Sequence, residues 1–430
     1  MDTATQSKAA ALHSSLRYKL ISFLSPEHVH AASDADIVAG VKPKLVVVPG
    51  SESEVAEALR LVSDAGLTVI PRGGGTKIGW GNPPSRADIV FSTARLNEIT
   101  EHAWADLTVS VGAGCTIQTL QATLAQHGQR LALDPLWPAK ATVGGVLSTN
   151  DSGALRLRFG ALRDLVIGAT LALPDGTLAS SGGKVVKNVA GYDLPKLATG
   201  AFGTLGMITR AVFRLHPLPR STCSFSIRAK AAEEARRLIH AIQNSKLAHT
   251  ALQARFENDT APIVHVLFEG TEAGLSAQEA HLKELTETAS LTVASPDIWN
   301  ARQDLWSLAK PESAAVAKIS VLPAEIDKSA TAIAKSAKVR QLRFKTLLQA
   351  TGIGFLKLEG DPANLRFSLL DLREQFESNA GSLVVLHRPA GMAPFDAWGS
   401  AGDALPLMKA IKKQLDPGNT LNPGRFVGGI

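Results

Sequence analysis

The stretch from Pro71 to Gly81, Pro-Arg-Gly-Gly-Gly-Thr-Lys-Ile-Gly-Trp-Gly, is the part of the chain that decides its fold. It follows Leu67–Ile70, an apolar run rich in β-branched residues that predicts a buried strand. Three consecutive glycines can adopt positive φ angles and let the backbone approach a ligand closely. Successive N–H groups in such a loop form a concave site for anions, and phosphate is the usual occupant. Because an ordinary tight turn also uses glycines, the loop alone leaves both interpretations open.

A βαβ unit is predicted around this loop. Leu45–Val48 has the composition of a strand, and Ser51 with Glu54 resembles a capping box at the start of a helix. The apolar residues of that helix recur at helical spacing on one face: Val55, Ala58, Leu59 and Val62. Leu67–Ile70 then returns as a parallel strand, so the glycine loop leaves the carboxyl end of a strand, where α/β sheets present ligand sites. The turn after the first strand lacks the G-x-G-x-x-G spacing of a Rossmann fold.

A second unit follows the first. Leu107–Val111 predicts a strand, and Thr116 can cap a helix that ends at Gly128. Thr142 is a plausible cap for a further helix, in which Gly144-Gly145 would expose N–H groups to a second side of the same ligand. Close helix packing is the alternative reason for these two glycines. Pro174-Asp175-Gly176 predicts a hairpin turn.

The C-terminal half is less regular. Pro217-Leu218-Pro219 has the composition of a linker. Beyond it, helix patterns at 231–242 and 365–376 alternate with possible strands at 263–268, 354–358 and 383–387, which predicts an α+β domain. The Ala- and Lys-rich stretch from Pro323 to Lys338 predicts a loop and a solvated helix.

Composition excludes several classes of protein. The chain has 430 residues, a formal charge of +6 and no apolar run long enough to cross a membrane. It carries no zinc-finger, basic-zipper or RNA-binding signature, so a nucleic-acid partner is not expected. Cys115 and Cys223 are far apart, so neither a disulfide framework nor a metal site is expected. Residues 1–25 lack a signal-peptide pattern, and we expect a cytoplasmic protein.

Six motifs in a fixed order give the chain a recognisable signature. They are P-R-G-G-G-T (71–76), D-P-L (134–136), A-T-V-G-G (141–145), N-D-S-G (150–153), K-N-V-A-G-Y-D-L (187–194) and G-T-L-G-M-I-T (203–209). This set resembles the FAD-linked oxidase family related to vanillyl-alcohol oxidase, strongly over residues 45–219. The resemblance resumes near the C-terminus with Leu415-Asp416-Pro417 and with the L-N-P-G-R-F segment from Leu421 to Phe426.

The family resemblance implies an α+β architecture. A p-cresol methylhydroxylase-type (PCMH-type) FAD-binding domain of two α/β subdomains would be joined to an α+β cap domain. The expected segments are a helical arm (1–43), the FAD-binding domain (44–219), the cap domain (220–400) and a segment returning to the FAD domain (401–430). The cofactor would extend between the two subdomains.

The same resemblance assigns residues to the cofactor. The pyrophosphate would be held by Pro71, Arg72, Gly73, Gly74, Gly75, Thr76, Thr142, Val143, Gly144 and Gly145. The flavin and its ribityl chain would lie along Pro135, Asn150, Ser152 and Gly153, and Gly206 and Ile208 would contact the cofactor from a returning strand. Because the glycine loop contains no histidine, we expect FAD to be bound non-covalently.

The catalytic groups are harder to assign. Catalytic relatives carry an H-G-D-G-type segment and an E-H-G segment in the cap domain, and this sequence has neither. His387 and Arg388 are the nearest candidates for a base and a carboxylate clamp, although such a pair is more often structural.

Three functional hypotheses follow from the resemblance. The first is an FAD-binding subunit of a glycolate (2-hydroxy acid) dehydrogenase, bacterial, with a sister FAD subunit and an iron–sulfur subunit, associated through them with the cytoplasmic face of the inner membrane. The second is a self-sufficient FAD-dependent 2-hydroxy acid or alcohol dehydrogenase. The third is a non-catalytic scaffold with a flavin fold.

Overall fold

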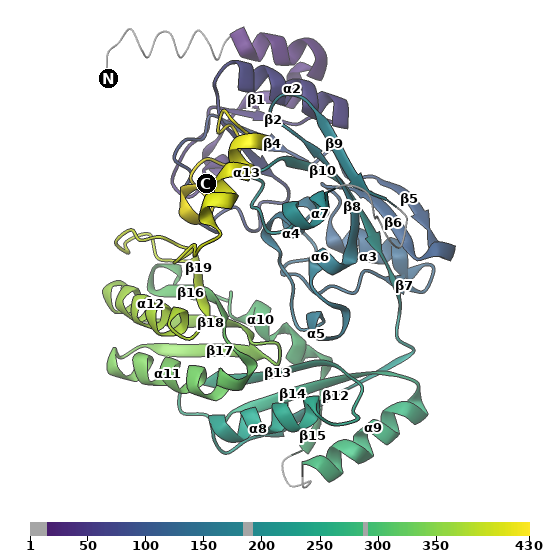
Figure 1. The fold of residues 1–430 in the computed structure, drawn as a ribbon, viewed down its shortest axis with the longest axis vertical. Coiled ribbons are helices and arrows are strands. Elements are labelled where there is room, and N and C mark those ends of the chain that lie inside the picture. The colour runs from purple at the N-terminus through teal and green to yellow at the C-terminus, as the bar shows by residue number, and fades with distance from the viewer. Residues whose placement is uncertain (1–14, 184–191, 287–290) are drawn as a thin grey trace. The chain divides into compact units, whose positions relative to one another are not determined.

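The computed structural model describes residues 15–183, 192–286 and 291–430, and within this part the chain forms two compact units (Figure 1). The first contains the described residues up to Ser152, together with Ala161–Pro217 and Ala401–Ile430. The second contains Gly153–Gly160 and the described residues of Leu218–Ser400. The short piece Gly153–Gly160 therefore leaves the first unit and returns to it, an excursion that the sequence did not suggest.

The first unit begins with a four-stranded sheet of order β1-β2-β4-β3. Its strands are β1 (Val29–Ala31), β2 (Leu45–Val47), β3 (Val69–Arg72) and β4 (Ile89–Ser92). Helix α2 (Glu52–Asp64) joins β2 to β3, and Glu54 N donates to Ser51 Oγ at 3.1 Å, as the capping pattern predicts. Both β2 and β3 run parallel to β4, which lies between them. The parallel direction was predicted, whereas the intervening strand was not.

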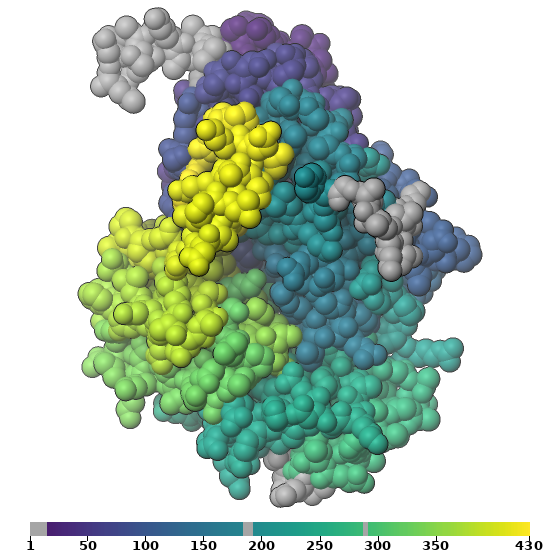
Figure 2. Space-filling view, viewed as in Figure 1, coloured from purple at the N-terminus to yellow at the C-terminus, as the bar shows by residue number. Residues whose placement is uncertain are grey.

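The free edge of β3 is paired with the C-terminal segment. Val69 N donates to Thr420 O at 2.7 Å, and Asn422 N donates to Val69 O at 2.9 Å, which makes a short parallel bridge. Helix α13 (Leu405–Leu415) leads into this segment, which is drawn in yellow against the rest of the first unit in Figure 2. Residues 15–24 are helical, and Leu16, Leu20 and Leu24 are buried in the core of this sheet and α2. The N-terminal arm is thus packed into the core as far as it is described.

A five-stranded antiparallel sheet of order β5-β6-β10-β8-β9 completes the first unit. Its strands are β5 (Ile99–Ala103), β6 (Thr108–Gly112), β8 (Val166–Ala172), β9 (Leu178–Gly182) and β10 (Met207–Arg214), with the short pair β7 (Gln129–Arg130) and β11 (His216–Pro217) beside them. The helices are α3 (Ile117–Ala125), α4 (Val143–Thr149), α6 (Leu162–Leu165) and α7 (Leu194–Ala198). Thr116 caps α3, and β8 and β9 form the hairpin predicted at Pro174-Asp175-Gly176.

The second unit is built on an eight-stranded antiparallel sheet of order β15-β12-β14-β13-β17-β18-β16-β19. The strands are β12 (Ser221–Arg228), β13 (His249–Glu257), β14 (Ile263–Gly270), β15 (Leu291–Ala294), β16 (Ala314–Ser320), β17 (Arg343–Gln349), β18 (Ile353–Glu359) and β19 (Ser382–His387). Its helices are α5 (Arg156–Phe159), α8 (Ala232–Gln243), α9 (Glu272–Leu285), α10 (Ala301–Asp304), α11 (Ile326–Val339) and α12 (Pro362–Glu377).

Helices α8, α11 and α12 pack on one face of this sheet, in a core that includes Ile239, Ile333 and Leu369 (Figure 1). The predicted helices at 231–242 and 365–376 are confirmed. The Ala- and Lys-rich stretch also forms a helix, α11, but the prediction of a merely solvated helix is wrong. Ile326, Ala330 and Ile333 are at most 3% exposed, because small and branched apolar residues at helical spacing line one face between the lysines.

Short 3-10 turns connect these elements. They are η1 (Pro26–His28), η2 (Asp34–Asp36), η3 (Trp104–Asp106), η4 (Pro296–Asn300), η5 (Pro311–Ser313), η6 (Pro323–Glu325) and η7 (Val427–Gly429). In the described ranges, no helix combines the length and the low polarity that a membrane span requires.

Candidate cofactor site

The first unit contains a groove at the carboxyl end of β3, formed by two adjoining hollows. One is lined by Pro71, Arg72, Gly73, Gly74, Gly75, Thr76, Lys77, Ile78, Thr142, Gly145, Ser148, Thr149, Phe202, Asn422 and Arg425. The other shares Arg72, Gly73 and Gly145 with the first and adds Thr93, Gly144, Gly203, Gly206, Met207 and Ile208. The glycine loop, α4 and the start of β10 therefore meet at one place, as the ordered motifs predict.

The glycine loop has the geometry of an anion site. The N–H groups of Gly73, Gly74 and Gly75 donate no hydrogen bond to any residue in the described ranges. Gly75 has a φ of +72°, and a Cβ atom on Gly74 would lie 1.7 Å from the carbonyl oxygen of Lys140. The loop thus needs glycine both for its conformation and for its close approach to the segment before α4, and its free donors face the groove.

The start of α4 differs from the prediction. Val143 N donates to Cys115 O at 2.9 Å, Gly144 N to Ala113 O at 2.8 Å, and Gly145 N to Thr142 Oγ1 at 3.4 Å. The expectation that these N–H groups are offered to a ligand is therefore wrong, because the carbonyl groups of Ala113 and Cys115, in the loop after β6, and the hydroxyl of Thr142 already accept from them. Thr142 caps α4 as expected, and the glycines of this turn give the ligand space rather than donors.

Three cations and no carboxylate are found among the described residues that line the groove. Arg72 Nη1 lies 2.6 Å from Asp36 Oδ1. The Asp36 carboxylate accepts hydrogen bonds from Ser33 and Arg72, and although burial opposes them, the pKa of Asp36 is lowered. Burial lowers the pKa of Arg425 to about 10, so its guanidinium still carries a charge at neutral pH. The groove therefore favours a polyanion such as a pyrophosphate.

Lys77 lies at the inner end of the glycine loop, and its side chain is 4% exposed. Its Nζ atom is 3.1 Å from Asp151 Oδ2 and lies over the rings of Trp80 and Trp137, at 5.7 and 5.4 Å from their centroids. Asp151 Oδ2 also accepts from Leu136 N at 2.9 Å. This buried pair fixes the loop to the D-P-L and N-D-S-G segments, which the sequence analysis noted without assigning Lys77 or Asp151 a role.

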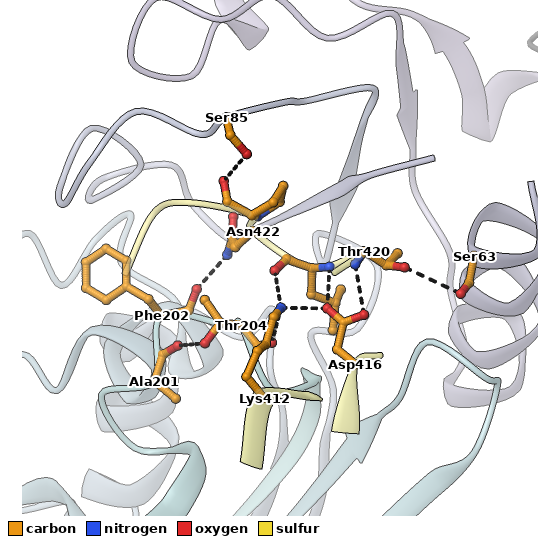
Figure 3. A network of polar contacts seen from close by, with 11 residues as sticks. Ser63, Ser85, Ala201, Phe202, Thr204, Lys412, Asp416, Thr420 and Asn422 are labelled. Carbon is orange, nitrogen blue, oxygen red and sulfur yellow. Dashed lines mark hydrogen bonds and ion pairs between the residues drawn. The ribbon is translucent and has the colours of Figure 1, made fainter. Parts of the chain in front are cut away.

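The C-terminal segment contributes Asn422 and Arg425 to the lining of the groove, and a polar network holds this segment in place (Figure 3). Lys412 Nζ donates to Thr204 O at 2.8 Å, to Leu421 O at 2.9 Å and to Asp416 Oδ2 at 2.6 Å. Asp416 in turn accepts from the N–H groups of Thr420 and Leu421, each at 2.8 Å. Asn422 Nδ2 donates to Phe202 O. The network therefore holds Asn422 and Phe202 next to each other in the lining of the groove.

Arg425 is held by the same segment. Its Nη2 atom donates to Ile78 O at 2.5 Å and to Trp80 O at 2.8 Å, and its guanidinium lies 5.8 Å from the centroid of the Phe202 ring. Sequence reasoning missed Asn422 and Arg425 as groove residues, although both belong to the closing L-N-P-G-R-F motif. Phe202 and Ser148 lie in none of the sequence motifs, so nothing in the sequence indicated that they line the groove.

Some predicted cofactor residues lie outside the groove. Pro135 is buried behind it, Val143 is 1% exposed, and Asn150 ends α4 in the left-handed conformation with a φ of +47°. Ser152 is buried at the end of the first unit, and Gly153 belongs to the second unit. Most of the K-N-V-A-G-Y-D-L motif lies outside the described residues. Asp193, the described acid of that motif, caps α7 by accepting from Lys196 N at 3.1 Å.

The candidate catalytic pair has structural partners within the second unit. His387 Nε2 lies 3.2 Å from Pro311 O, and burial lowers the pKa of its imidazole. Arg388 Nη1 donates to Phe395 O at 2.6 Å and lies over the Phe395 ring. Among the described residues, no group of three or more His, Cys, Asp and Glu side chains is arranged to hold a metal ion.

A glycine-lined, cationic groove between two α/β layers defines a dinucleotide-binding protein, and comparison with known proteins narrows the class. Family models match for an FAD binding domain (residues 43–182) and for the C-terminal domain of FAD linked oxidases (residues 398–426). The chain is 25% identical over 417 residues to glycolate oxidase subunit GlcD of Bacillus subtilis (strain 168), covering 89% of each chain. It is 26% identical over 422 residues to a mitochondrial D-lactate dehydrogenase (cytochrome) of Arabidopsis thaliana, covering 90% of this chain and 73% of the relative.

The fold is also shared with a solved structure. The crystal structure of p-cresol methylhydroxylase with substrate bound has a TM-score of 0.77 at 14% identity and covers 96% of both chains. The chain matches the FAD binding domain and the C-terminal domain of FAD linked oxidases and is an FAD-dependent oxidoreductase. The predicted resemblance to FAD-linked oxidases, the PCMH-type fold and FAD as the cofactor are thus confirmed, and the free N–H groups and cations of the groove fit the pyrophosphate of FAD.

Proposed function

We propose that this chain is the FAD-binding subunit of a 2-hydroxy acid dehydrogenase of the glycolate oxidase type. The observation that carries the proposal is the groove of the first unit, where free loop donors meet Arg72 and Arg425. Support for the substrate class comes from relatives named glycolate oxidase subunit and D-lactate dehydrogenase. We infer that the chain corresponds to the FAD-binding E subunit of bacterial glycolate oxidase, because it lacks the cap-domain histidine motifs, although the relative found by comparison is named subunit GlcD.

In this proposal the residues of the groove bind and orient the cofactor. The N–H groups of Gly73 to Gly75 donate to the pyrophosphate, and Arg72 and Arg425 balance its charge. Gly145 and Gly206 leave room for the bound cofactor, and Ile208 contacts the cofactor from β10. FAD, when bound, accepts the hydride from the carbinol carbon of the hydroxy acid, which becomes a 2-oxo acid as its hydroxyl proton passes to a base or to solvent.

The proposal of partner subunits is supported by the hydrogen bonds that already engage the candidate base and its neighbour. His387 and Arg388 are both engaged by backbone carbonyls, and no imidazole or carboxylate is among the described residues lining the groove. We therefore propose that a sister FAD subunit supplies the fuller catalytic site and that an iron–sulfur subunit takes the electrons. We further propose that the assembly is cytoplasmic, at the inner membrane through its partners, and that FAD is held non-covalently.

A self-sufficient dehydrogenase is the second candidate. The match to the Arabidopsis D-lactate dehydrogenase extends over 90% of this chain, including the second unit, and the relative's name describes a complete enzyme. This candidate requires a base that the groove does not supply. The two proposals therefore differ in whether the chain alone oxidises its substrate.

Anaerobic stopped-flow absorbance separates them. The FAD-loaded chain is mixed with glycolate or D-lactate, alone and after co-expression with the sister and iron–sulfur subunits. We expect little bleaching of the flavin in the lone chain, because general base catalysis worth about 10²–10⁴-fold is missing, and turnover with an artificial acceptor in the complex. Rapid bleaching in the lone chain would instead establish the self-sufficient dehydrogenase.

A further inference from the structure

The second unit carries a row of polar side chains on the sheet face that α8, α11 and α12 do not cover. Successive residues of a strand point to opposite faces. On β12 and β14 the apolar core side chains are Phe225, Ile227, Val264 and Val266, so Ser226 and His265 project from the other face. By the same alternation, Gln253 and Gln349 lie on that face beside the core residues Leu252 and Leu348.

The row is in register across five neighbouring strands. Thr292 of β15 pairs with Ser226 of β12, and Ser226 pairs with His265 of β14. His265 pairs with Gln253 of β13, which pairs with Gln349 of β17. Directly opposed residues in antiparallel strands have Cβ atoms about 4.5–5.5 Å apart. His265, Gln253 and Gln349, on three neighbouring strands, are therefore close enough for their side chains to contact one small molecule together.

Three of the four are buried without satisfying their polar atoms. Gln253 is 1% exposed, Gln349 2% and His265 3%. The Gln253 Nε2, Gln349 Nε2 and His265 Nε2 atoms have no hydrogen-bond partner among the residues that the structure describes. Buried polar atoms in proteins are nearly always paired, with protein, water or ligand. Three unpaired nitrogen atoms in one row therefore indicate a site for a hydrogen-bond acceptor that is not part of the described protein.

The surroundings of the row explain its burial. Helix α5 contacts β13. Trp299 Nε1 donates to Ser224 Oγ at 3.0 Å, and Lys357 Nζ donates to Ser307 O at 3.0 Å, which lays the segment from η4 to Ser307 across the same face. The segment from η4 to Ser307 therefore lies over the face that carries the row, where apolar side chains would have left no polar atom unpaired.

The chemistry of the row favours an anion with oxygen acceptors. Ser226 Oγ and His265 Nδ1 are 2.9 Å apart, and when the hydroxyl donates to Nδ1, the proton of the neutral imidazole is on Nε2. His265 Nε2 and the two glutamine Nε2 groups are then all donors. Burial and the nearby charge of Arg255 lower the pKa of His265 to about 4, so the ring is neutral at neutral pH.

We propose that Ser226, His265, Gln253 and Gln349 form a binding site for a small carboxylate. The amide groups of Gln253 and Gln349 and the Nε2–H group of His265 donate to the carboxylate oxygens, and Ser226 fixes the tautomer of His265. That the natural ligand is a 2-hydroxy acid rests on the function proposed above. The site itself does not depend on that function.

Binding is measured on the complete FAD-loaded chain by NMR of ¹³C-labelled histidine and by calorimetry. His265→Gln identifies the His265 signal among the 11 histidines, and glycolate and D-lactate are the probes. We expect a saturable shift of this signal, and a dissociation constant about tenfold weaker in Gln253→Leu and in Gln349→Leu, the effect of one hydrogen bond to a charged group. Gln253→Glu, nearly isosteric but of repelling charge, should abolish binding, and the exposed Gln375→Leu is the matched control.

The outcomes separate this site from the proposed function. A His265 shift that saturates and depends on both glutamines supports the site, even if no hydroxy acid reduces the flavin in any assembly, a result that would contradict only the proposed function. The site is disproved if neither carboxylate shifts the His265 signal, or if binding is unchanged in the Gln253→Glu chain while its FAD content and circular dichroism match those of the wild type. In that case the row holds water only.

Discussion

Gly74 and Gly145 both line the groove, and the space around each gives it a different role. A Cβ atom at Gly74 would meet the Lys140 carbonyl oxygen at 1.7 Å, whereas at Gly145 it would meet only Thr142 Oγ1, at 3.3 Å. Gly74 is therefore needed because the loop backbone packs directly against the backbone of Lys140. Gly145 is needed for the space that it leaves in the groove.

These environments predict two different phenotypes. Gly145→Val should keep the fold and weaken FAD binding at least about tenfold, a loss of about 1.4 kcal/mol, because its methyl groups enter the groove. Gly74→Val should lower thermal stability as well, because the backbone around Lys140 must move to make room for the side chain. Titration of apo-protein with FAD and thermal unfolding measure the two effects, and Gly79→Val, with open space around its Cβ position, is the control. Full FAD affinity in Gly145→Val would contradict the placement of the cofactor.

His265 gives a prediction that depends on pH. Burial and the charge of Arg255 lower its pKa from 6.5 to about 4, so the folded state binds fewer protons than the unfolded state between these values. Stability present above pH 6.5 should be lost as the pH falls through 6.5 to about 4, by up to ~3 kcal/mol. Histidine NMR should show one signal still neutral at pH 5, absent in His265→Gln. If the signal that disappears in His265→Gln titrates near 6.5, this would contradict the burial of the His265 ring.

Helix α13 and the strand-like residues after it act as one element that positions Asn422 and Arg425. The buried Lys412–Asp416 pair holds this element through Thr204, Thr420 and Leu421. Burial lowers the pKa of Lys412, against the opposing effect of Asp416, which shows that the ammonium is removed from water. The groove therefore depends on a pair that does not line it.

Lys412→Met should destabilise the first unit by about 3–5 kcal/mol, because Asp416 keeps a buried charge without its partner. FAD affinity should fall in parallel as Asn422 and Arg425 lose their support. Urea unfolding and FAD titration are compared with Lys413→Met, which removes an exposed charge from the same helix. If Lys412→Met bound FAD as tightly as Lys413→Met, the C-terminal element would not support the groove.

At the level of elements, local features were predictable and non-local pairings were not. Helix α2 could be predicted because Ser51, Glu54 and the spacing of Val55 to Val62 all lie within one segment. The insertion of β4 between β2 and β3, and the pairing of Val69 with Leu421, depend on contacts between distant segments that leave no local pattern. The row of Ser226, His265 and Gln253 was missed for the same reason, since each residue looks ordinary within its own strand.

For the whole molecule, the ordered motifs were enough to predict the PCMH-type fold and FAD, because six motifs in one fixed order carry the family resemblance although each motif alone is weak. Non-covalent binding remains a prediction. No His, Cys or Tyr is among the described residues lining the groove. Acid precipitation should therefore release FAD into the supernatant, where chromatography identifies it. Flavin that stays with the precipitated protein would contradict the prediction.

The central claim is that the groove recognises the pyrophosphate of FAD through the glycine loop and the C-terminal segment. Equilibrium titration of the apo-protein with FAD and FMN, with ADP as a competitor, tests it most directly. FMN lacks the pyrophosphate, whereas ADP contains one. We therefore predict that FAD binds at least about 100-fold more tightly than FMN, as loss of two or more charge-assisted hydrogen bonds implies, and that ADP displaces FAD competitively. Equal affinity for FMN and FAD, together with no displacement by ADP, would contradict the claim.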